Sequence, residues 1–113
     1  MKITRVYAGP DGVSHFDKWE ISYEIKPDIG WQSLPMKANE VVFREKEGRH
    51  EGGWHCVPQK QLVVLFEGEL EVETSDGDKR HFNAGDVFLC EDMTGQGHKV
   101  RGMNRKTLVI RLA

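Results

Sequence analysis

Residues 69–82 read Glu-Leu-Glu-Val-Glu-Thr-Ser-Asp-Gly-Asp-Lys-Arg-His-Phe, and they carry the dominant strand signal of the chain. In residues 69–74 polar and apolar side chains alternate strictly, as a half-buried strand requires. Asp76-Gly77 follows, and an Asp-Gly pair favours a tight hairpin turn because both residues tolerate positive φ. Residues 79–82 resume as the return strand, so the whole stretch predicts a β-hairpin.

Strand patterns continue on both sides of this hairpin. Residues 106–112 alternate again, with Leu108, Ile110 and Leu112 on one face. No long stretch keeps the 3.6-residue apolar period of a helix. Short strands with turn residues between them predict an all-β sandwich or barrel. The further strands that we expect cover residues 3–7, 18–25, 40–45, 61–66 and 86–90.

The length and composition predict one domain. With 113 residues the chain is long enough for a modest core. We expect residues 1–113 to form a single domain, with N-terminal strands and a loop in residues 1–38. Residues 39–113 would then form the core of the barrel.

The charge and hydropathy patterns argue against two classes of partner. The 16 basic and 18 acidic residues are scattered, with a net charge of −2, so we expect no nucleic-acid binding. The longest apolar stretch, residues 62–66, is too short to span a bilayer. Residues 1–5 lack the apolar core of a signal peptide, so we expect a cytoplasmic location. The two cysteines, Cys56 and Cys90, are then expected as free thiols rather than as a lone disulfide.

Two segments carry more specific information. Residues 53–61 read Gly-Trp-His-Cys-Val-Pro-Gln-Lys-Gln and lead into the strand at 62–66 and the Glu-Gly-Glu turn at 67–69. Residues 82–89 read Phe-Asn-Ala-Gly-Asp-Val-Phe-Leu, and residues 92–98 read Asp-Met-Thr-Gly-Gln-Gly-His. Together these segments resemble the two motifs of the cupin superfamily, and more narrowly those of small single-domain cupins of the cupin-2 type. The resemblance implies a cupin jelly-roll barrel (a double-stranded β-helix) and a homodimer with the N-terminal strands at the interface.

The resemblance also implies a metal site. Metal-binding cupins present two histidines one residue apart, then a glutamate, then a later histidine. His55 and His98 match the first and last ligands, Val57 replaces the second histidine, and Gln61 stands at the glutamate position. We therefore expect His55, Gln61 and His98 to hold one divalent ion (Zn, Ni, Fe or Mn) at the centre of the pocket. The alternative is a cupin without its metal, in which the same three side chains hydrogen-bond a ligand.

Strand alternation supports the same grouping. If His55 points into the barrel, then Val57, Gln59 and Gln61 do so as well, because side chains on a strand alternate with period two. Asp92 is expected to orient a histidine, to act as a general base at the pocket rim, or to cap its own turn. His15, His50 and His81 are expected at the surface. Beyond the metal ligands, the expected pocket residues are Trp54, Val57, Gln59, Val63, Phe88 and Asp92.

Two functions follow from this pocket, and neither assigns a catalytic residue. One is a metal-dependent enzyme of the isomerase, lyase or oxygenase type that acts on a small polar metabolite. The other is a non-catalytic module that binds a sugar-like small molecule at a degenerate metal site. The fold alone does not separate them, because a barrel of this type hosts many functions.

Overall fold

A computed structural model describes residues 1–113. The chain forms nine β-strands, joined by turns and loops, and no helix. The prediction of an all-β fold is confirmed. No helix is present that could cross a membrane. The strands are β1 (Lys2–Ala8), β2 (Ser14–Glu20), β3 (Glu24–Lys26), β4 (Gly30–Gln32), β5 (Ala38–Glu51), β6 (Gln61–Thr74), β7 (Lys79–Asn83), β8 (Val87–Cys90) and β9 (His98–Leu112).

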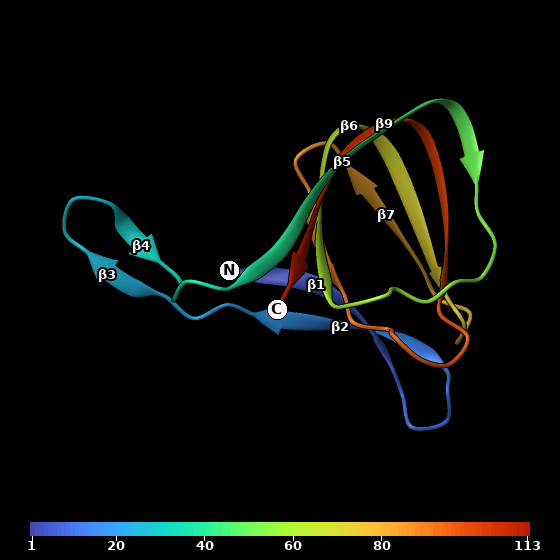
Figure 1. Cartoon of the computed structure of the whole chain (residues 1–113), viewed down its shortest axis with the longest axis horizontal. Helices are drawn as coiled ribbons and strands as arrows, with labels where there is room; N and C mark the ends of the chain where they lie inside the picture. Colours follow the sequence, from blue (N-terminus) through green and yellow to red (C-terminus); the bar gives the residue numbers. More distant parts are fainter.

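Seven strands form one curled sheet in the order β2-β1-β8-β6-β9-β5, with β7 paired to β6. The first half of β6 pairs with β8, and its second half pairs with β7. β9 follows β6 along almost its whole length, so β6 and β9 bend together around the barrel (Figure 1). The β1–β8 pair is parallel, and the other pairs are antiparallel.

The bend in β6 depends on Gly68. The register between β6 and β9 shifts around Glu67, and Gly68 has a φ of 79°. A side chain at this position would overlap the carbonyl oxygens of Met103 and Asn104 on β9. The adjoining Asn104 also has a positive φ, of 47°. The two strands therefore cross closely here, and glycine permits both the conformation and the approach.

The core lies inside the curled sheet. Alternate residues of β6 are buried, as the alternating sequence pattern predicts, and Leu65, Leu70 and Val72 are at most 1% exposed. Phe82 and Phe88 stack across the interior with ring centroids 4.4 Å apart. Packed apolar side chains of this kind supply most of the free energy of folding.

The sequence located most strands, but the strand expected at 40–45 extends over Ala38–Glu51, and the structure differs from the expectation in three further places. The segment 18–25 forms two strands, because the β1–β2 ladder ends where Ile21 N donates to Met1 O. β4 was not expected. β9 begins at His98, eight residues before the expected start at 106, because the irregular conformation at Asn104 interrupts the alternation of the strand.

The β3–β4 hairpin projects away from the barrel (Figure 1). It pairs Ile25 with Trp31 across its strands, and both side chains are largely exposed. The hairpin and its flanks form an apolar arm, defined here by its exposed side chains Tyr23, Ile25, Ile29, Trp31, Leu34 and Met36.

Candidate metal and ligand site in the barrel

A cavity of about 100 Å³ lies inside the barrel. It adjoins a wider mouth of about 310 Å³, and His50 and Leu70 line both spaces. Five of the expected site residues lie in its wall: His55, Gln61, Val63, Phe88 and His98. The other wall residues are Arg44, His50, Leu70, Cys90, Val100, Arg105, Thr107 and Val109.

The two histidines are brought together by a backbone bridge. His55 N donates to His98 O at 3.1 Å, and His98 N donates to His55 O at 2.9 Å. The imidazole centroids are 4.6 Å apart. Gly97 permits this close approach: its φ is 78°, and a side chain there would overlap the His55 carbonyl group. The Gly-rich stretch before His98 is therefore a structural requirement of the histidine pair.

Each imidazole uses its Nδ1 atom to fix the ring. His55 Nδ1 lies 2.9 Å from the carbonyl oxygen of Gly53, which can only accept, so Nδ1 carries the hydrogen. His98 Nδ1 lies 2.5 Å from Asp92 Oδ2 in a short, charge-assisted hydrogen bond. Neither Nε2 atom has a partner in the chain. Histidines that ligate metals are held by a carbonyl or carboxylate oxygen in this way.

Gln61 supplies a third polar atom. The residue is 7% exposed, and its Oε1 atom is buried without a hydrogen-bond partner. A buried amide oxygen without a partner costs free energy, so its position favours a ligand that accepts its lone pairs. The cavity wall thus offers two imidazole nitrogens and one amide oxygen that the protein leaves uncommitted.

Four expected pocket residues lie outside the cavity wall. Val57 is 4% exposed and belongs to the apolar core. Gln59 Nε2 donates to the Leu112 carbonyl at 2.9 Å, and Trp54 packs under the Lys99 ammonium group. Asp92 is fully buried and reaches the cavity only through His98. The alternation argument does not hold after His55, because residues 56–60 form no strand: Pro58 and a bend interrupt the period.

A second group of donor atoms lies next to this wall. Cys90, Asp92 and His98 are all buried, their ligand atoms lie within 4.8 Å of one another, and the group could hold a metal ion. Burial raises the pKa of the Cys90 thiol well above its usual value, and the Asp92 carboxylate adds to the rise. Asp92 and His98 already bind each other. Asp92 Oδ1 is buried without a hydrogen-bond partner and is free to ligate. A metal here would still have to displace the proton of a thiol whose pKa is raised, so this group is the poorer donor set.

Sequence reasoning missed the basic side of the cavity. Arg44, Arg105 and His50 lie in the wall, although His50 was expected at the surface. Arg105 has the strand parity of Thr107 and Val109, which are buried. The alternation in 106–112 instead marks Leu108, Ile110 and Leu112, of the opposite parity, as the apolar face, so the sequence did not point to Arg105. Arg44 has the parity of Val42, which packs against the core. Strand parity in 40–45 was thus the one signal available for Arg44.

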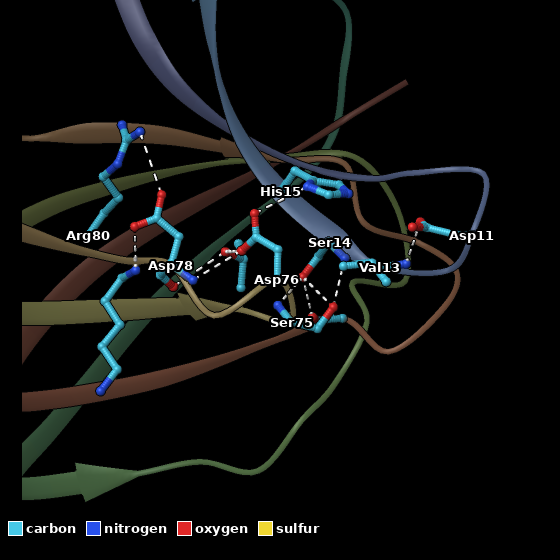
Figure 2. Close-up of polar contacts among 11 residues, drawn as sticks. Asp11, Val13, Ser14, His15, Ser75, Asp76, Asp78 and Arg80 are labelled. Carbon is cyan, nitrogen blue, oxygen red and sulfur yellow. Dashed lines mark hydrogen bonds and ion pairs between the residues drawn. The ribbon is translucent and has the colours of Figure 1, made fainter.

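The loop that carries His98 is tied to the N-terminal strands. Ser14 is buried, and its hydroxyl donates to Gly97 O at 2.7 Å. The same hydroxyl accepts from Ser75 N at 2.8 Å, which joins β2 to the turn between β6 and β7 (Figure 2). His15 and Asp76 pair beside it at 3.1 Å. These contacts fix the backbone next to His98.

Both cysteines are free thiols, and Cys56 donates to Gly95 O at 3.2 Å.

No protein-family model and no curated protein matches the chain. Solved structures with a similar fold include a cupin-2 domain protein from Shewanella frigidimarina, at 18% identity and a TM-score of 0.47, over 73% of this chain and 83% of that one. A protein from Neisseria meningitidis matches at 17% identity and a TM-score of 0.46, over 65% of this chain and 72% of that one. A Salmonella typhimurium protein described as a putative ethanolamine utilization protein Q matches at 16% identity and a TM-score of 0.44, over 98% of this chain and 95% of that one. These likenesses concern the fold, and no residue role is taken from them.

Proposed function

We propose that the barrel cavity is the active site of a metal-dependent enzyme acting on a small polar metabolite, by isomerase, lyase or oxygenase chemistry. His55, His98 and Gln61 would hold one divalent ion. The supporting observation is that His55, His98 and Gln61 line one cavity, and that the Nε2 atoms of the two histidines and the buried Oε1 atom of Gln61 have no hydrogen-bond partner within the chain.

The donor set fits the ion. Two imidazoles and an amide oxygen suit Zn, Ni, Fe or Mn, and three protein ligands leave coordination positions for substrate or water. When bound, such an ion polarises a carbonyl group or lowers the pKa of water. The chain itself supplies the rest: Gly53 O and Asp92 orient the imidazoles, and Val63, Phe88 and Val109 form the apolar part of the cavity wall.

A non-catalytic binding module is the second candidate. Val57 is packed in the core at the position of the second cupin histidine, and Gln61 is neutral where a carboxylate would attract a cation. In this case His55, Gln61 and His98 would hydrogen-bond a sugar-like ligand directly. The binding module is favoured because only three side chains could ligate a metal and one of them is a neutral amide. The enzyme is favoured because hydrogen bonds fix the two imidazole rings and the Nε2 and Oε1 atoms have no hydrogen-bond partner within the chain.

Metal content separates the two candidates. We expect elemental analysis of untagged protein to find about one divalent ion per chain, and none in the His55→Ala/His98→Ala double variant. The control is His81→Ala, which removes a histidine outside the cavity and keeps the ion. Protein that stays free of metal after soaking with divalent ions would exclude the enzyme as proposed and leave the binding module.

We also propose that residues 1–113 form one domain that acts as a homodimer in the cytoplasm. Support for the dimer comes from the apolar arm, because an exposed apolar patch on this scale marks an interaction surface. Exposed Val41, Phe43 and Phe66 on β5 and β6 extend the apolar surface available to a second copy.

A further inference from the structure

The cavity wall contains two arginines and no carboxylate. Its ionisable side chains are those of Arg44, His50, His55, Cys90, His98 and Arg105, and no Asp or Glu lies among them. Burial, followed by the charge on Arg105, lowers the pKa of His50 and so disfavours the charged form of this imidazole. The two arginines therefore supply fixed positive charge to a small cavity.

Neither arginine is neutralised by the protein. Two other arginines of β9 have acidic partners: Arg101 binds Glu71 and Glu73, and Arg111 binds Glu40. Arg105 and Arg44 form no ion pair with any residue, and Arg105 Nε is buried without a hydrogen-bond partner. A half-buried guanidinium group without an anion is costly, and burial together with Arg44 lowers the pKa of Arg105.

The strand register places the two arginines side by side. Arg44 on β5 pairs with Thr107 on β9, and Arg105 precedes Thr107 by two residues. Residues related in this way point to the same face of a sheet, roughly 7–8 Å apart, within reach of long side chains. Both guanidinium groups can therefore converge on one anion, and the planar guanidinium geometry matches a carboxylate.

We propose that the cavity takes a small carboxylic acid, whose carboxylate is bound by Arg105 and Arg44 while its remaining polar atoms face His55, Gln61 and His98. This rests on the proposed function in that both place the ligand in the same cavity. The cavity, at about 100 Å³, is smaller than the ~150 Å³ cavity that accommodates benzene, so the acid is short.

Calorimetric titration with glycolate and pyruvate tests the proposal, with glycolamide and pyruvamide as neutral counterparts and inorganic phosphate as a second anion. Each titration uses both EDTA-treated and zinc-loaded protein at constant ionic strength. We expect the acids to bind and the amides not to. Arg105→Gln should weaken acid binding by roughly tenfold to a hundredfold, as loss of a hydrogen bond to a charged group does. Lys106→Gln, which removes a neighbouring charge outside the cavity wall, should leave it unchanged.

The outcomes are separable from those of the metal proposal. Acid binding by metal-free protein that depends on Arg105 supports this inference even if no metal is ever found. A chain that holds zinc but binds neither acid overturns it and leaves the metal proposal intact. Equal binding of acids and amides, equal binding by Arg105→Gln, or binding of phosphate alone would also overturn it. If Arg105→Gln fails to fold by circular dichroism, Arg44→Gln on the edge strand β5 replaces it.

Discussion

At the scale of single residues, the site depends on how closely two backbones approach. The His55–His98 bridge has its close contact at Gly97, whose positive φ and missing side chain leave room for the His55 carbonyl. The imidazoles are then turned by Gly53 O and by Asp92. A change in either the backbone contact or these acceptors would alter where the Nε2 atoms lie, without touching the ligand atoms themselves.

Gly97→Ala should therefore lower the free energy of unfolding by roughly 2–5 kcal/mol, because it adds backbone strain and a clash with His55. Gly77→Ala is the control: Gly77 also has a positive φ, of 92°, but lies in open space. The free energy of unfolding of Gly77→Ala should fall by only about 1–2 kcal/mol, because this variant adds backbone strain alone. Urea denaturation measures both. Equal losses in the two variants would show that the close approach to His55 contributes nothing.

At the scale of elements, Ser14 joins three segments that are far apart in sequence. Its buried hydroxyl links β2, the β6–β7 turn and the loop before β9. Ser14→Ala should lower the free energy of unfolding by about 1–3 kcal/mol, because Gly97 O and Ser75 N both lose their partner. Ser33→Ala removes a hydroxyl that bonds only the adjacent Leu34 carbonyl, and should cost less than about 0.5 kcal/mol. A loss at Ser14 no larger than at Ser33 would contradict this role.

Elements governed by local chemistry were predictable from the sequence. The β6–β7 hairpin depends on alternation and on Asp76-Gly77, which act within a few residues. The first half of β9 was not predictable, since the irregularity at Asn104 hides its alternation and only pairing with β6 and β5 makes it a strand. The two histidines and Gln61 came from motif spacing. Arg44, Cys90 and Arg105 did not, because they reach the cavity through the register of three separate strands.

At the scale of the whole molecule, the apolar side chains of the arm are not covered by the barrel. Ile25, Ile29 and Trp31 are each more than 60% exposed, and the β3–β4 hairpin projects away from the barrel (Figure 1). Burying such side chains stabilises an assembly by about 1.5–3 kcal/mol each. The dimer proposed above depends on these exposed side chains.

Light scattering should give a mass close to twice the 12.9 kDa of the chain. The Ile25→Asp/Trp31→Asp double variant should shift the mass to that of the monomer, because charged groups at the interface would be buried without partners. Met93→Asp, which changes an exposed apolar residue outside the arm, should remain a dimer. A monomeric wild-type protein would contradict the proposed dimer.

Cobalt substitution distinguishes a metal ion held by His55, Gln61 and His98 from one held by Cys90, Asp92 and His98. Co²⁺ bound by nitrogen and oxygen ligands gives weak d–d bands, whereas a thiolate ligand adds an intense charge-transfer band in the near ultraviolet. We expect one Co²⁺ per chain, with d–d bands only. The bands should persist in Cys90→Ser and disappear in His55→Ala/His98→Ala. A thiolate band that Cys90→Ser abolishes would place the metal at Cys90, Asp92 and His98, and no uptake of Co²⁺ would contradict a metal site altogether.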